Sequence, residues 1–218
     1  MALAIFDLDN TLIGGDSDHL WGQFVCARGL VDSEAFSALN DQFYADYQSG
    51  NLDIAAYLRF ALAPLKGQPL DVLAEWHRDF MSAMIAPVML PKARQLIANH
   101  RDRRDNLLII TATNEFITRP IAAALGIDDI LACEAEIVDG LYTGEPTGTP
   151  SYKEGKITRL EEWLRGRDIS LDGAYFYSDS HNDLPLLEQI DKPVAVDPDD
   201  TLLARAHEAG WPVISLRS

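Results

Sequence analysis

The sequence predicts an α/β protein in which a doubly wound, Rossmann-like parallel sheet carries an inserted all-helical segment. Two observations predict the sheet: short apolar runs without alternation, which are typical of strands buried on both faces, and helical patterns between those runs. A third observation predicts the insertion, because residues 15–88 contain no strand-like run. The length of 218 residues suits one large domain or a domain with a sizeable insertion.

Short apolar runs predict the strands of this sheet. They cover residues 2–6, 107–110, 174–177, 194–196 and 213–216. Helical patterns separate them at residues 91–100, 115–125, 155–164 and 184–190. Near residues 136–143, Asp139-Gly140 lies between apolar residues and predicts a small β-hairpin.

Four successive helices are predicted in the insertion, over residues 19–28, 33–48, 54–65 and 70–85. Aromatic residues recur in them at helical spacing, and we expect these side chains to fill the core of the segment: Trp21, Phe24, Tyr57, Phe60 and Trp76. The predicted domains are therefore an α/β core of residues 1–14 and 89–218, and a helical domain of residues 15–88.

Composition and charge exclude several classes of protein. With 34 acidic and 18 basic residues the net charge is −16, which repels nucleic-acid phosphates and anionic membrane surfaces. No apolar stretch approaches the roughly 18 residues that a membrane-spanning helix needs. Two cysteines are too few for a disulfide framework or a zinc cluster, and the first six residues lack the basic region of a secretory signal. We expect a cytoplasmic protein that binds neither nucleic acid nor membranes.

Polar residues follow three predicted strands, at the edge of the sheet where doubly wound folds bind their ligands. They are Asp7, Asp9 and Thr11 after the first strand, Thr111 to Asn114 after the second, and Ser178, Asp179, Asn182 and Asp183 after the third. Because side chains alternate along an extended segment, Asp7 and Asp9 are expected to point into one pocket and Leu8 towards the core. This number of hard oxygen ligands favours Mg²⁺, which shares its coordination with substrate phosphate.

Each feature alone also has an ordinary structural explanation. Thr113 is an acceptable helix N-cap, and Asp183 in the first turn of a helix complements the helix dipole. Lys156 is different, because a cation near a helix N-terminus is mildly unfavourable and implies an anion nearby. Lys153 is close enough to compete for that role, whereas His19 and His181 are expected to be solvated.

Taken in order, these segments resemble the four motifs of the haloacid dehalogenase superfamily of phosphohydrolases. The motifs are Asp-Leu-Asp-Asn-Thr at 7–11, Leu-Ile-Ile-Thr at 108–111, Lys156, and Ser-Asp-Ser-His-Asn-Asp at 178–183. The helical insertion resembles the C1 cap of that superfamily. The similarity is greatest to the phosphoserine-phosphatase-like branch, which also contains histidinol-phosphate phosphatases.

The resemblance implies a Mg²⁺-dependent phosphatase that acts on a small phosphorylated metabolite through an aspartyl-phosphate. Asp7 would be the nucleophile, and Asp9 would protonate the leaving alcohol and then activate water. The metal ligands would be Asp7, Asp9 through its carbonyl, Asp179 and, in a supporting position, Asp183. The groups that bind the phosphoryl oxygens would be Thr111, the Ala112 N–H, Lys156 and Asn182.

The same resemblance implies where substrate specificity arises. Asp16 and Arg59 match the cap Glu and Arg that bind the substrate in the phosphoserine-phosphatase pattern. Ala112-Thr113-Asn114 replaces a Gly pair, and together with residues 178–187 it looks more like the histidinol-phosphatase type. The predicted substrate is an amine-bearing metabolite such as histidinol phosphate, with phosphoserine as the alternative. A phosphomutase, a phosphoryl-accepting signalling domain and a non-catalytic cation-binding domain are more distant alternatives.

Overall fold

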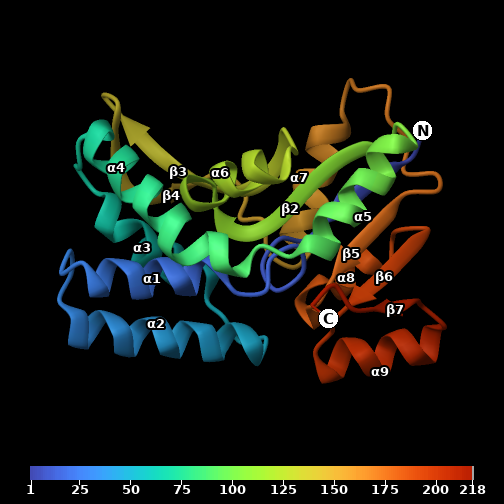
Figure 1. Ribbon diagram of the computed structural model, residues 1–218, viewed down its shortest axis with the longest axis horizontal. Helices are drawn as coiled ribbons and strands as arrows, with labels where there is room; N and C mark the ends of the chain where they lie inside the picture. Colours follow the sequence, from blue (N-terminus) through green and yellow to red (C-terminus); the bar gives the residue numbers. More distant parts are fainter. Residues whose placement is uncertain (218) are drawn as a thin grey trace.

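The computed structural model describes residues 1–217, and a mostly parallel sheet forms its centre (Figure 1). The strands are β1 (Leu3–Phe6), β2 (Asn106–Asn114), β3 (Asp129–Val138), β4 (Leu141–Thr147), β5 (Tyr175–Ser178), β6 (Lys192–Val196) and β7 (Val213–Ile214). Their order is β4-β3-β2-β1-β5-β6-β7, and the β3–β4 pair is antiparallel whereas the other pairs are parallel. The prediction of a doubly wound parallel sheet is therefore confirmed.

The helices lie between the first strand, β1, and the last, β7, along the chain. They are α1 (Ser17–Ala27), α2 (Ser33–Gln48), α3 (Ile54–Leu62), α4 (Leu70–Phe80), α5 (Pro91–Asp102), α6 (Glu115–Leu125), α7 (Glu154–Leu164), α8 (Leu184–Leu187) and α9 (Asp200–Ala209). In Figure 1, α1–α4 gather on the left beside the tip of the β3–β4 hairpin, and β5–β7 lie on the right with α9. Within the described residues, no helix is long and apolar enough to cross a membrane.

Strand β1 shows how the sequence covers both faces of the sheet. Ala4 and Phe6 belong to the apolar cluster that includes α5 and α6, whereas Leu3 and Ile5 belong to the cluster that includes α7, α8 and α9. Successive side chains of a strand point to opposite faces, so a continuous apolar run is what a strand covered on both faces requires.

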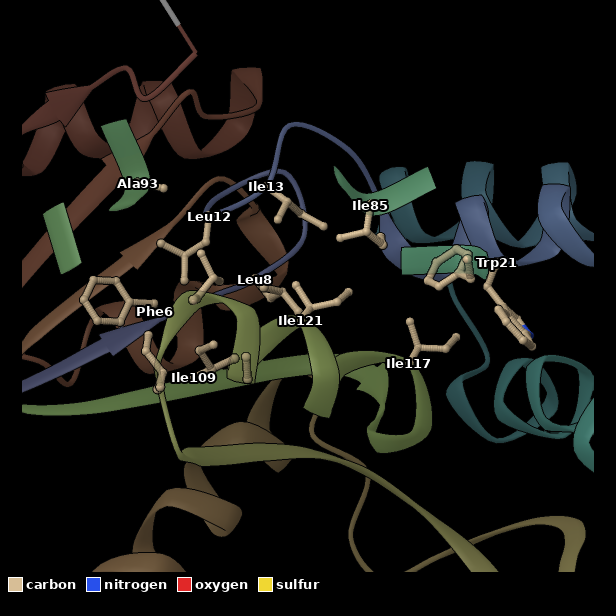
Figure 2. Close-up of a cluster of buried hydrophobic side chains, with 14 of the residues drawn as sticks. Phe6, Leu8, Leu12, Ile13, Trp21, Ile85, Ala93, Ile109, Ile117 and Ile121 are labelled. Atoms are coloured by element: carbon tan, nitrogen blue, oxygen red, sulfur yellow. The ribbon is translucent and has the colours of Figure 1, made fainter. Parts of the chain in front are cut away.

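The first of these clusters continues from the sheet into the helical insertion. Figure 2 shows Phe6 and Ile109 of the sheet, Leu8 and Leu12 of the following loop, and Trp21 of α1 in one packed group. Where the chain enters and leaves the insertion, Ile13 pairs with Met89 and the Gly14 N–H donates to the Val88 carbonyl at 2.8 Å. This crossing lies next to the predicted boundaries at residues 14/15 and 88/89, and the division into two domains stays a prediction.

Several elements differ from their predicted extent. The third predicted helix of the insertion ends as α3 at Leu62 and continues as a 3₁₀ turn containing Pro64, whose ring disfavours an α-helical interior. The fourth changes at Met81 from α-helix to a π-helical turn. The predicted hairpin is confirmed, because Asp139 and Gly140 have φ of 52° and 80° and join β3 to β4 by a two-residue turn.

Candidate active site

The loop after β1 presents the first two carboxylates. The Asp7 N–H donates to the Tyr177 carbonyl at 2.9 Å, so the pairing of β1 with β5 extends to the start of the loop. The chain then turns tightly, because the Leu8 carbonyl accepts the N–H of Leu12 at 2.9 Å. Leu8 is fully buried in the core, which confirms the expected alternation of side chains between Asp7 and Asp9.

Lys156 connects two of the carboxylates. Its Nζ lies 2.8 Å from Asp7 Oδ1 and 2.6 Å from Asp183 Oδ1, and all three side chains are buried. Ser178 Oγ donates to the other oxygen of Asp183 at 2.7 Å. Burial raises the pKa of Asp7 well above its ordinary value, Lys156 opposes that rise, and the neighbouring carboxylates add to it. The anion that the position of Lys156 implied is thus this pair of carboxylates.

Asp9 is held by donors on both of its oxygens. The Ser17 N–H donates to Oδ1 at 2.7 Å, and the hydroxyls of Thr113 and Thr111 lie 2.8 Å and 3.3 Å from Oδ2. Burial raises the pKa of Asp9, although these hydrogen bonds favour its ionised form. Thr113 is not the N-cap of α6, because the Asn114 side chain fills that position by accepting the Ile117 N–H.

Asp179 is the fourth carboxylate at this edge of the sheet, after Asp7, Asp183 and Asp9. Thr11 Oγ1 donates to its Oδ1 at 2.9 Å and accepts its backbone N–H at 3.1 Å. Burial, with the negative charge of Asp183, raises the pKa of Asp179 to about 7. Among residues 1–217, no group of three or more His, Cys, Asp or Glu side chains is arranged to hold a metal ion. Carboxylate oxygens are the ligands that a hard cation takes, so the residues here that could hold one together with its waters are Asp7, Asp9 and Asp179.

Lys153 and Asn182, which were both considered for phosphate binding, contact the helical insertion. Lys153 Nζ donates to the Gly50 carbonyl at 2.7 Å, in the insertion. Asn182 donates from Nδ2 to the Tyr47 carbonyl at 3.0 Å and accepts the Tyr152 hydroxyl at 3.1 Å. Both side chains therefore connect the core to the end of α2, and of the two lysines it is Lys156 that lies against Asp7.

A cavity lies above Asp7 and Asp9, between the sheet edge and helices α1–α3. It is lined by Asp7, Asp9, Asp16, His19, Asn40, Phe43, Tyr44, Tyr47, Leu52, Tyr57, Thr111, Ala112 and Thr113. Within the described part of the chain, no lysine or arginine belongs to this lining. Asp16 caps α1, since its Oδ1 accepts the N–H groups of Asp18 and His19 at 3.0 Å and 2.8 Å. Burial raises the pKa of Asp16 well above its ordinary value, and Asp9 adds to the effect.

Three predictions about the insertion are not supported by this geometry. Arg59 is not brought into the cavity: its side chain is 58% exposed and donates to Glu145 Oε2 of β4 at 2.8 Å. His19 is not simply solvated, because it stacks on Tyr44 with a 4.7 Å ring separation and lies 3.1 Å from Asn40 Nδ2. Tyr57 lines the cavity instead of joining the apolar core.

His181 is also bound rather than solvated, since its Nδ1 lies 2.8 Å from Asp199 Oδ2.

The cavity residues of α2 were missed from the sequence. Asn40, Phe43, Tyr44 and Tyr47 follow the spacing i, i+3, i+4, i+7 and so share one helical face. Asn40 is the buried residue of this otherwise poorly buried helix. The sequence signal that could have identified these residues is a row of aromatic side chains on an otherwise polar helix. Such a row indicates the wall of a cavity and not an apolar core.

Comparisons with known proteins agree with this architecture. The family model of haloacid dehalogenase-like hydrolases matches residues 4–188. A histidinol-phosphatase of Neisseria meningitidis serogroup C is 51% identical over 219 residues, which cover 99% of each chain. Among solved structures, a protein of unknown function from Bordetella pertussis Tohama I aligns with a TM-score of 0.92 and 39% identity, over 99% of this chain and 98% of that one. A substrate-bound phosphoserine phosphatase aligns with a TM-score of 0.72 and 17% identity, over 99% and 93% of the two chains, which shows a shared fold.

Proposed function

Because the chain belongs to the family of haloacid dehalogenase-like hydrolases, we propose that it is a phosphatase that hydrolyses histidinol phosphate. The observation that carries this choice of substrate is the cavity above Asp7, which presents Asp16 and aromatic side chains but no lysine or arginine among the described residues. Histidinol phosphate carries an ammonium and an imidazole and has no carboxylate. Phosphoserine carries a carboxylate, which would find no lysine or arginine in this lining.

The phosphoryl group is proposed to react at Asp7. An Asp7 oxygen forms a bond to phosphorus while the bond from phosphorus to the substrate oxygen breaks, and water then releases phosphate from the aspartyl-phosphate. Lys156, 2.8 Å from Asp7, is placed to balance the negative charge that spreads over the phosphoryl oxygens. Thr111 and the Ala112 N–H line the same cavity and supply hydrogen-bond donors to those oxygens.

Asp9 is proposed to move the proton. Its carboxyl group gives a proton to the departing alkoxide and later takes one from the attacking water. Burial raises the pKa of Asp9, which suits this role because a buried carboxyl holds its proton to a higher pH than an exposed one. No proton donor is needed when a leaving group departs readily as an anion, so Asp9 matters most for alkyl phosphates.

Mg²⁺ is the proposed cofactor. Asp7, Asp179 and the Asp9 carbonyl would hold it, with Asp183 in support through its bond to Lys156. The bound ion would supply positive charge beside the phosphoryl oxygens. The fit rests on the carboxylates at this edge: burial first, and then the negative charge of their neighbours, raises the pKa of Asp7 and Asp179.

Asp16 is proposed to bind the substrate ammonium, and the aromatic wall of Tyr44 and Tyr57 to hold the imidazole. The test compares kcat/KM for histidinol phosphate, phosphoserine and p-nitrophenyl phosphate in Mg²⁺, for the native chain and for Asp16→Asn. Asparagine caps a helix as well as aspartate does, so the substitution removes charge and keeps the cap.

The expected result is a preference for histidinol phosphate that Asp16→Asn reduces about tenfold, with little change for p-nitrophenyl phosphate. Asp7→Asn removes turnover of all three substrates. A higher kcat/KM for phosphoserine would refute the choice of substrate, and turnover that survived Asp7→Asn would refute the mechanism.

A further inference from the structure

The Thr113 hydroxyl makes the shorter of two threonine contacts to Asp9, at 2.8 Å against 3.3 Å for Thr111. With the Ser17 N–H on Oδ1 at 2.7 Å, it leaves the carboxyl group a single orientation. We infer that Thr113 is a positioning residue for Asp9, which aims the proton-transferring group at the leaving oxygen. The inference rests on the proposed phosphatase activity and adds a residue to its machinery.

The end of β2 explains why Thr113 reaches Asp9. Residues i and i+2 of an extended segment point to the same side, so Thr111 and Thr113 face the sheet edge together, as Asp7 and Asp9 do. The β2–β3 pairing also shifts register between Ile110 and Asn114, so the regular ladder is interrupted over this segment.

Cys133 of β3 restores a contact where the ladder is interrupted. Its Sγ donates to the Ala112 carbonyl at 3.0 Å and accepts the Ser151 N–H at 3.2 Å. Burial raises the pKa of Cys133 to about 12, so the thiol keeps its proton and remains a donor. The backbone that carries Thr113 is therefore fixed from the side opposite Asp9.

The two threonines then have separate tasks. The Thr113 N–H donates to Thr111 Oγ1 at 3.2 Å and occupies an acceptor position of that hydroxyl. The Thr111 proton makes the longer contact to Asp9, at 3.3 Å, and can turn from there towards a phosphoryl oxygen. When it does so, Thr113 still holds Asp9. Loss of the Thr113 hydroxyl should thus impair protonation of the leaving group and spare phosphate binding.

The test measures kcat/KM, which reports the steps up to departure of the leaving group, for histidinol phosphate and p-nitrophenyl phosphate. The variants are Thr113→Val and Thr113→Ala, which lack the hydroxyl, and Thr113→Ser, which keeps it. Thr118→Val is the matched control, because Thr118 is a buried threonine whose hydroxyl donates to the Asn114 carbonyl. Inhibition by inorganic phosphate reports phosphate binding.

We expect the hydroxyl-free variants to lose about tenfold or more in kcat/KM for histidinol phosphate, which must release an alkoxide, and about threefold or less for p-nitrophenyl phosphate. Thr113→Ser should restore most of the loss, Thr118→Val should show none, and inhibition by phosphate should not change. Equal losses for the two substrates, or weaker inhibition by phosphate, would overturn the inference. A native chain inactive on both substrates would instead refute the proposed function itself, and this inference with it.

Discussion

At the scale of single residues, Lys156 joins two buried carboxylates that would otherwise lie unpaired. Its ammonium group contacts Asp7 and Asp183, and its side chain is fully buried at the start of α7. Breaking a buried ion pair by removing one partner is strongly destabilising, because the remaining charge is left in a poorly solvating site. The same residue therefore contributes to folding and, by the proposed mechanism, to phosphoryl transfer.

Lys156→Met is expected to abolish activity and to lower the free energy of unfolding by about 3–5 kcal/mol. Denaturant unfolding and turnover of p-nitrophenyl phosphate measure the two effects. The double variant Lys156→Met with Asp183→Asn removes one of the stranded charges, so it should recover part of the stability and none of the activity. Activity that returned with stability would contradict a chemical role for Lys156.

At the scale of elements, a buried network joins the starts of β1 and β2, at the edge opposite the candidate site. Asp105 accepts the Ala2 N–H at 2.8 Å and lies 2.9 Å from His100 Nδ1, while His100 Nε2 lies 2.9 Å from the Tyr177 hydroxyl. Burial acts to raise the pKa of Asp105, but these hydrogen bonds outweigh it and the pKa is lowered. The network thus fixes the register of the two central strands.

A lowered pKa in the folded state predicts stability that is present above the unfolded pKa of about 3.9 and is lost as the pH falls through the folded value. Asp105→Asn should therefore lower Tm by about 2–4 °C near pH 6, and the difference from the native chain should shrink below about pH 4. Calorimetry across this range measures it. Asp102→Asn, at the exposed aspartate that ends α5 three residues before Asp105, is the control and should show no such trend. A difference in Tm between the native chain and Asp105→Asn that did not change with pH would contradict a stabilising role for the ionised Asp105 carboxylate.

The elements predicted from sequence are those with strong local patterns. The continuous apolar run of β1 and the Asp139-Gly140 turn are both confirmed, because each depends on a few adjacent residues. Helix α9 was missed because few of its residues are buried, although Asp199 as N-cap and Gly210 as C-cap mark its ends. The first half of β3, which pairs with β2, was also missed from the sequence.

At the scale of the whole molecule, the position of the insertion on the core decides which cap residues reach the site. Asp7 and Lys156 could be predicted from the sequence, because strand ends of a parallel sheet meet at one edge. The contacts of Arg59 and His19 could not be predicted from the sequence. A helical pattern shows on which face of a helix a residue lies, but it does not show which element packs against that face. Arg59 forms an ion pair with Glu145 of the β3–β4 hairpin. Aromatic residues of α2 line the cavity.

The net charge of −16 acts on the substrate before any contact forms. A dianionic phosphate ester is repelled at long range, and salt screens that repulsion by shortening the Debye length from about 30 Å at 0.01 M to about 8 Å at 0.15 M. Over this range, kcat/KM for p-nitrophenyl phosphate should rise about two- to threefold in Mg²⁺. Histidinol phosphate should respond less, because its ammonium offsets part of its charge. A fall in kcat/KM with added salt would show that the positive groups of the site, and not the surface carboxylates, govern how substrate approaches.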